Sequence, residues 1–162
     1  MEKERCEQTI GVMHTAASLA MRYGADMEQA LTAGLLHDCG KFCSAKDQLK
    51  LCEKKGIELT ESERAMPALI HAKLGAYLAR HEYGIKDEAV LNAITYHTTG
   101  RPDMTMLEKI VYIADYIEPN RKKIPGLAEV RRLAFTDIDE AVCSTAGATK
   151  SYMEDGGKAV DP

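Results

Sequence analysis

The residues in this sequence best placed to do chemistry are His37 and Asp38, which stand side by side, with Lys41 three residues further on. The pair ends an apolar run that is typical of a helix. Adjacent residues on a helix point about 100° apart, so both side chains can reach one atom only where the helix ends or is distorted. We expect Gly40 to end it, because glycine accepts the left-handed conformation that stops a helix.

For an isolated pair of this kind, the simpler interpretation is a helix C-terminus where His37 and Lys41 favour the helix dipole. Asp115 argues for a site instead. It stands in the apolar run 111–117, where an ionised carboxylate is costly to bury unless it is paired or bound to a metal. Together, His37, Asp38 and Asp115 offer a donor set suited to iron, manganese or another divalent ion, with positions left for water and substrate. The other candidate metal ligands are His14, His71 and His97.

Length and composition narrow the class of protein. The 162 residues fit one domain, 1–162, large enough to bury a core. The net charge of -4 and the lack of a basic stripe argue against nucleic-acid binding through phosphate neutralisation. No apolar run could span a bilayer, and the first residues do not form a signal peptide. The five cysteines form no Cys-x-x-Cys pair, which favours reduced thiols in the cytoplasm.

Helical periodicity runs through the chain, and no segment alternates convincingly as a strand would. Start signals include Asp26 with Gln29, which resembles a capping box, and Ser44, while Gly56 and Pro119 are stop signals. We expect helices over residues 4–23, 26–38, 44–56, 67–84, 87–97, 107–117, 127–134 and 137–154. The fold class is therefore all-α, with helices lining a central pocket.

Three blocks of the sequence, residues 5–42, 71–78 and 96–121, resemble the HD-domain metal-dependent phosphohydrolases. The last two blocks are more specific than His-Asp alone, and they narrow the resemblance to the YqeK branch, the symmetrical diadenosine tetraphosphate hydrolases. The resemblance implies one HD-domain helical bundle around a metal and nucleotide pocket. Family members usually continue past residue 162, so we expect the C-terminal family segment to be shortened here.

The resemblance implies that His37, Asp38 and Asp115 bind a divalent metal, iron first and manganese as the alternative, with one or two ions. The family's fourth ligand is a histidine, and Gln8 stands at that position. A glutamine carbonyl is a weaker, neutral ligand. His14 lies six residues further on, about 120° away round a helix, so it cannot replace the missing ligand unless the helix rolls or shifts.

Other positions match the family's active site. His71 and His97 fall where the family has two further histidines, which would hold a second metal or donate to phosphate oxygens. Lys41 matches a lysine near the phosphates, and Arg121 would bind phosphate through two donors. The resemblance thus implies catalytic roles for Asp38, Lys41, His71 and His97, and substrate binding by Lys41, His71, His97, Thr98, Thr99, Gly100 and Arg121.

The implied reaction is hydrolysis of diadenosine tetraphosphate to two molecules of ADP. The metal would lower the pKa of a bound water, and the cationic side chains would neutralise charge on the polyphosphate. Two alternatives stay open: a catalytically weakened nucleotide-binding protein, which Gln8 would favour, and a phosphomonoesterase or phosphodiesterase for another nucleotide. The expected partner is a nucleotide such as ADP, not a nucleic acid or a membrane, and a homodimer is left open.

Overall fold

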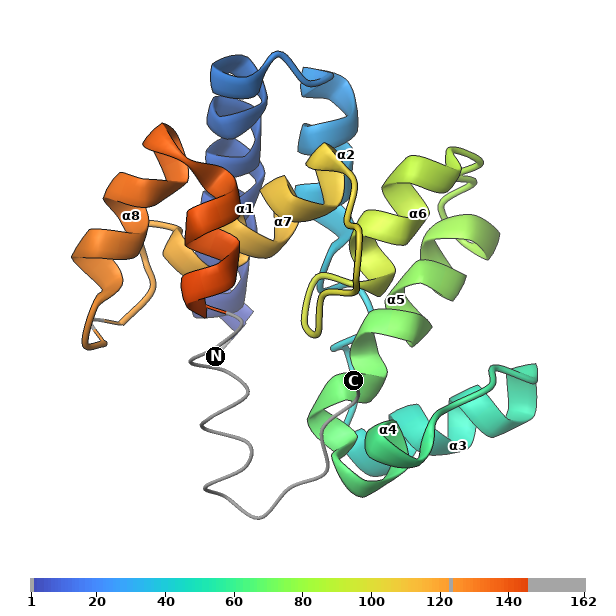
Figure 1. The fold of residues 1–162 in the computed structure, drawn as a ribbon. Helices are drawn as coiled ribbons and strands as arrows, with labels where there is room; N and C mark the ends of the chain where they lie inside the picture. Colours follow the sequence, from blue (N-terminus) through green and yellow to red (C-terminus); the bar gives the residue numbers. More distant parts are fainter. Residues whose placement is uncertain (1, 123, 146–162) are drawn as a thin grey trace.

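The computed structural model describes residues 2–122 and 124–145, and every regular element in this part of the chain is a helix (Figure 1). The all-α prediction is confirmed. The elements are α1 (Glu2–Tyr23), α2 (Met27–Leu36), α3 (Ala45–Lys55), α4 (Glu61–Ala65), the 3-10 turn η1 (Pro67–Leu69), α5 (Ile70–His81), α6 (Glu88–Thr95), α7 (Met106–Ile117) and α8 (Leu127–Thr136). Residues 138–145 are helical too, and the rest of the helix expected to residue 154 lies outside the described residues.

Local signals set most of the helix boundaries. Ser44 accepts a hydrogen bond from the Asp47 N–H at the start of α3, and Gly56 ends that helix with a φ of 72°. The capping box expected at α2 forms only in part. Asp26 accepts from the Gln29 N–H, but the Gln29 side chain donates to Asp87 at the start of α6 (2.8 Å). This bond ties α2 to α6, which a local pattern could not predict.

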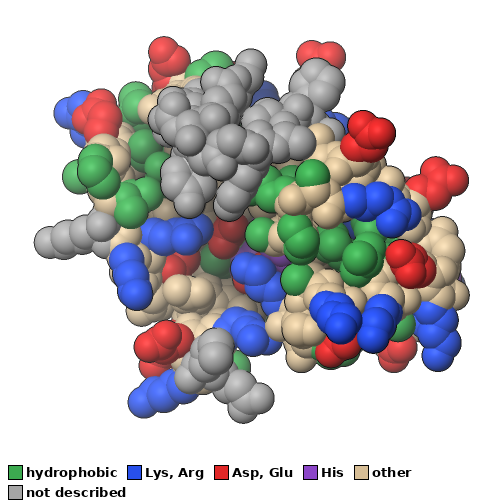
Figure 2. Space-filling view, turned by 90° about the horizontal axis from the view of Figure 1, so that it is seen from below, with side chains coloured by type: hydrophobic (Ala, Val, Ile, Leu, Met, Phe, Trp, Pro, Cys, Tyr) green, Lys and Arg blue, Asp and Glu red, His purple; other side chains and the backbone are tan. Residues whose placement is uncertain are grey.

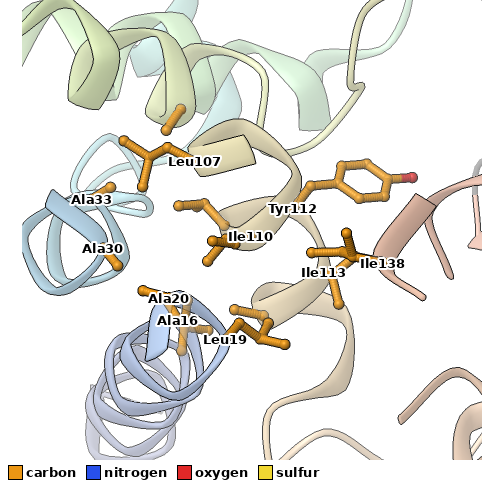
Figure 3. Close-up of a cluster of buried hydrophobic side chains, with 14 of the residues drawn as sticks. Ala16, Leu19, Ala20, Ala30, Ala33, Leu107, Ile110, Tyr112, Ile113 and Ile138 are labelled. Carbon is orange, nitrogen blue, oxygen red and sulfur yellow. The ribbon is translucent and has the colours of Figure 1, made fainter. Parts of the chain in front are cut away.

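Helix α7 lies at the centre of the main hydrophobic core. Its fully buried Ile110 and Ile113 pack among small side chains of α1 and α2 and against the helix that follows α8 (Figure 3). Glycine lets α1 and α2 come close, since a Cβ at Gly34 would lie 2.8 Å from the Cα of Met13. The end of α2, which leads into His37, is thereby held against α1 and near α7.

Helix α5 joins this core to a smaller lobe formed by α3 and α4, which lie at one end of α5 (Figure 1). The lobe has its own apolar cluster of Cys52, Ile70 and Leu74, two of which belong to α5. Further along α5, the buried Ala79 belongs to the main core instead. Because α5 is packed from both sides, the position of its first turn is well defined.

In the described part of the chain, no helix is both long and apolar enough to cross a membrane. All five cysteines lie in that part, and each is a free thiol. Cys39 donates to the carbonyl of Gly75 (3.2 Å), and burial together with the charge of Asp38 raises the pKa of its thiol to about 11. Cys39 therefore contributes to packing between the α2 turn and α5, not to thiolate chemistry.

Candidate metal site

Five of the side chains proposed from the sequence meet in one cluster. His37 and Asp38 stand on the turn after α2, His71 on the first turn of α5, His97 just after α6, and Asp115 on α7. His37 Nε2 lies 3.3 Å from Asp38 Oδ2 and 3.3 Å from Asp115 Oδ1. Asp38 Oδ1 lies 3.3 Å from His71 Nε2 and 3.4 Å from His97 Nε2. Four helices thus supply one centre of two carboxylates and three imidazoles.

Gly40 brings the turn that carries Asp38 onto α5. A Cβ at Gly40 would collide with the carbonyl oxygen of His71 and would lie 2.8 Å from the Gly75 nitrogen. The expectation that Gly40 ends α2 in a left-handed conformation is wrong, because its φ is not positive. Helix α2 passes through His37 into a turn, and glycine is needed for the close approach of two backbones.

The same local hydrogen bond orients all three imidazoles. The Nδ1 of each histidine lies 2.7–2.8 Å from the backbone carbonyl three residues earlier in the chain. Because a carbonyl oxygen can only accept, each Nδ1 carries the hydrogen and each Nε2 faces the cluster. The residues that accept from His37, His71 and His97 are Gly34, Ala68 and Ile94, respectively. A ring fixed through its other nitrogen is the usual arrangement of a metal-binding histidine.

His37 lies between two carboxylates, and the three groups stabilise one another's charges. Burial lowers the pKa of His37, but hydrogen bonds to Asp115 and Asp38 outweigh it and raise this pKa to about 10. Burial raises the pKa of Asp38, yet hydrogen bonds from His37, His71 and His97 bring it well below its usual value. Burial also raises the pKa of Asp115, but the hydrogen bond and charge of His37 outweigh burial, so the net shift of this pKa is downward. Both acids are therefore ionised at neutral pH.

The two remaining histidines face each other, with 3.2 Å between His71 Nε2 and His97 Nε2. Since each Nδ1 already carries a hydrogen, two neutral rings would oppose their Nε2 lone pairs at this distance. A proton or a cation between them makes the contact favourable. Burial lowers the pKa of His71, against the hydrogen bond to Asp38 that raises it, and the net shift is downward.

Two groups of described residues have the geometry to hold a metal ion: His37 with His97 and Asp115, and Asp38 with His71 and His97. Their mixed nitrogen and oxygen donors suit a divalent first-row metal. The cluster is open to solvent on the side of Asp115, whose side chain is 30% exposed while that of His37 is 1% exposed. A water or a substrate oxygen can therefore reach a metal held here.

Two of the expected phosphate-binding residues border this centre. Lys41 Nζ lies 3.8 Å from Asp38 Oδ2. Arg121 Nη2 donates to the backbone carbonyl of Asp115 (2.9 Å) and lies 4.0 Å from its Oδ1. Both side chains are exposed, so their remaining donors are open to a ligand. Figure 2 shows Lys and Arg side chains around a hollow on one face of the molecule, with histidine and acidic side chains visible inside it.

The loop after His97 contributes less than the sequence suggested. Thr98 Oγ1 lies 3.5 Å from His71 Nε2, so its hydroxyl is at the edge of the cluster. Thr99 is exposed, and its hydroxyl donates to the Gly100 carbonyl (3.0 Å). The Gly100 N–H donates to the carbonyl of Tyr96 (2.8 Å) and is already engaged. Of these three residues, Thr98 is the one that meets the histidines.

Gln8 and His14 both lie exposed on α1, and neither has a hydrogen bond to the cluster in the described part of the chain. The turn of α1 that carries Gln8 does pack close to the end of α7. Asn120 Nδ2 donates to the Glu7 carbonyl (3.1 Å), and a Cβ at Gly11 would meet the Glu118 side chain. Position 8 therefore lies between two contacts with the segment that follows Asp115.

Sequence reasoning missed Glu108, which is buried beside the loop that follows His97 and pairs with Arg101. A signal for it was present, because Glu108 precedes Asp115 by seven residues, about two turns of the same apolar helix, and so shares its face. An acidic residue on a buried helical face requires a partner, and Arg101 in the preceding loop was the nearest cation in sequence after Lys109.

Comparisons with known proteins agree with this geometry. The family model described as HD domain matches residues 5–120. A Bacillus subtilis protein described as "Bis(5'-nucleosyl)-tetraphosphatase, symmetrical" is 44% identical over 155 residues, which cover 94% of this chain and 81% of that protein. A Staphylococcus aureus protein of the same description is 40% identical, over 94% of this chain and 79% of its own. The crystal structure of a predicted HD superfamily hydrolase involved in NAD metabolism from Clostridium acetobutylicum matches with a TM-score of 0.91 and 42% identity, over 97% of this chain and 82% of that one.

Proposed function

This chain belongs to the HD domain family, and we propose that it is a metal-dependent hydrolase that cleaves diadenosine tetraphosphate symmetrically to two molecules of ADP. The observation that carries the proposal is the centre of His37, Asp38 and Asp115, which has a cationic side chain on either side. This centre occurs in a chain 44% identical to a symmetrical tetraphosphatase. The centre supplies metal-binding groups, and the flanking cations supply phosphate-binding groups.

We assign His37, Asp38 and Asp115 as the ligands of a divalent metal, with iron preferred and manganese as the alternative. When bound, such an ion lowers the pKa of a ligated water and polarises a phosphoryl oxygen. Asp38, His71 and His97 form the second group, which would take a second ion or contact phosphate oxygens. Gln8 stands on α1 at the family's fourth ligand position, where its exposed side chain would be a weaker, neutral ligand.

One cation stands beside each of the two carboxylates of the centre. Lys41 stands beside Asp38 and Arg121 beside Asp115, while His37 lies between these two carboxylates. A polyphosphate that crosses the centre would therefore meet a cation on each side of the bond that breaks. Charge that develops on either half in the transition state would be neutralised by Lys41 and Arg121, and by a cation held between His71 and His97.

Product analysis tests this function. Chelator-treated protein is reloaded with iron(II) or manganese(II), given diadenosine tetraphosphate, and its products are separated by ion-exchange chromatography. Two ADP per substrate are expected. ATP and AMP in equal amounts would contradict symmetrical cleavage, and binding of ADP without turnover would favour the weakened nucleotide-binding protein. Release of phosphate from nucleoside monophosphates, or opening of cyclic nucleotides, would favour the other phosphoesterases.

Two further points belong to the proposal. The free cysteines support a reducing compartment such as the cytoplasm. A homodimer is a separate hypothesis, which sedimentation velocity at several protein concentrations would decide. Neither point affects the assignment of the metal-binding and phosphate-binding residues.

Arg121→Lys is expected to lower kcat/KM for diadenosine tetraphosphate about tenfold, because lysine keeps the charge but loses the planar fork that meets phosphate through two donors. Arg121 also donates to the Asp115 carbonyl, and one ammonium group cannot replace both roles. Steady-state kinetics measure the effect. Lys122→Ala, at the next exposed position, is the control and should change kcat/KM little. An unchanged kcat/KM in Arg121→Lys would place Arg121 outside the substrate site.

Metal binding is expected to release a proton even at pH 8.5. The pKa of His37 is about 10 without a metal, and an imidazole must be neutral at Nε2 to ligate an ion. Affinity for manganese(II) should therefore rise with pH throughout the range below about 10. Calorimetric titration at pH 8.5 under nitrogen, in buffers of different ionisation enthalpy, counts the protons released. If His37 had an ordinary histidine pKa, it would already be neutral at pH 8.5 and metal binding would release no proton from it. Absence of proton release at pH 8.5 would therefore contradict the assignment of His37 as a ligand.

A further inference from the structure

An ion pair between the half-buried Arg101 and the buried Glu108 closes the loop that follows His97. Glu108, on the first turn of α7, is 1% exposed. Arg101 donates to it through two nitrogens, from Nε to Oε1 (2.7 Å) and from Nη2 to Oε2 (2.8 Å). Thr105 Oγ1 donates to Oε2 (3.0 Å) and accepts from the Glu108 N–H (3.2 Å). Both partners of this carboxylate come from the loop 98–105, so the loop is fastened to α7 at a buried point.

Arg101 also connects the loop back to the residue before His97. Its guanidinium lies over the ring of Tyr96, with Cζ 4.3 Å from the ring centroid. The Gly100 N–H donates to the Tyr96 carbonyl, and Gly100 has a φ of 68°, which allows the tight turn. The loop is thus held at both ends, on Tyr96 and on Glu108.

The helix that holds this loop through Glu108 also carries Asp115 of the candidate metal site. Glu108 and Asp115 are seven residues apart on α7, so they lie on one face of the helix, about two turns apart. One helix therefore presents Asp115 to the centre and holds the loop that carries Thr98, whose hydroxyl lies 3.5 Å from His71 Nε2. Neither Arg101 nor Glu108 reaches the cluster itself.

We infer that Arg101 and Glu108 are a positioning pair, which sets the place of Thr98 and His97 relative to the phosphates of a bound nucleotide. The inference rests on the proposed function. The pair acts by geometry: a shift of about 1 Å in a group that contacts substrate can cost up to about 100-fold in rate. Because the loop is anchored on the helix that bears Asp115, the phosphate donors and the metal ligands keep a fixed separation.

Arg101→Lys tests the pair, since lysine keeps the charge but loses the two-nitrogen contact and the stacking on Tyr96. KM for diadenosine tetraphosphate and Kd for ADP should each rise about tenfold, with a smaller change in kcat. Binding of the ion assigned to His37, Asp38 and Asp115 should stay unchanged, because these three residues lie outside the loop 98–105. The matched control is Arg80→Lys, in the Arg80–Glu88 pair that links α5 to α6 on the surface. Its KM and Kd should remain native.

Thr98→Val is made both in the native chain and in the Arg101→Lys variant, and the comparison decides whether Arg101 acts through Thr98. The change is expected to weaken ADP binding about tenfold in the native chain but only about twofold in Arg101→Lys, because contacting groups are not additive. Additive effects, or an Arg101→Lys variant that behaves like Arg80→Lys, would overturn the inference. If the native chain binds ADP without hydrolysing the tetraphosphate, the proposed function fails, while the coupling in ADP affinity still decides this inference. A native chain that neither binds ADP nor hydrolyses the tetraphosphate would overturn both.

Discussion

Asp115→Ala is expected to lose its bound metal and to lower hydrolysis by more than about 100-fold, since removal of groups that only support a metal ligand already costs about 10–100-fold. Asp115 is one of two carboxylates in contact with His37 Nε2. Its removal takes away a ligand and a negative charge that offsets the charge of the ion. Metal content by mass spectrometry and kcat/KM with added manganese(II) or iron(II) are the measurements.

The fold should survive this change. The Asp115 side chain is 30% exposed, and alanine suits a helix. Circular dichroism and thermal unfolding of the chelator-treated variant would confirm this. Asp139→Ala is the control, because Asp139 is a surface acid paired with Lys109 and lies away from the cluster. Asp139→Ala should keep both metal and activity. Full metal occupancy in Asp115→Ala would mean that His37 and Asp38 bind the ion with other partners.

Helices were predictable because their signals are local. The spacing of apolar residues in α7 and the residues Ser44 and Gly56 at the ends of α3 act within a few positions, so they are visible in the sequence itself. Helix α4 was not predicted, although Thr60 and Glu63 form a capping box at its start. It has five residues and lacks the apolar repeat that a periodicity search requires.

The site was predictable to the extent that its residues belong to sequence motifs. His37, Asp38, His71, His97 and Asp115 do meet, as the resemblance to the family implied. Contacts that depend on packing between distant segments were not predictable. Gly40 is needed because its turn touches α5, not because of its own conformation. The position of Glu108 on the buried face of α7 was visible in the sequence, but its bonds to Arg101 and Thr105 depend on how the loop 98–105 folds over it.

Gln8→His is expected to raise metal affinity about 10- to 100-fold, because imidazole is a better donor than an amide carbonyl for a first-row divalent ion and adds no charge. The surrounding contacts favour the substitution. Glu7 and Gly11, on either side of position 8, touch Asn120 and Glu118 just beyond the helix that carries Asp115. Gln8 is exposed, so its replacement should break no existing packing.

His14→Ala separates this assignment from its rival. His14 lies on the same helix, about 120° round from Gln8, and is exposed, so its loss should leave metal affinity nearly unchanged. Titration of manganese(II) into the parent and both variants gives the comparison. A gain in Gln8→His with no loss in His14→Ala would mean that α1 already directs position 8 toward the centre. If Gln8→His gains nothing and His14→Ala loses the metal, α1 must rotate on metal binding, and the ligand from this helix is His14.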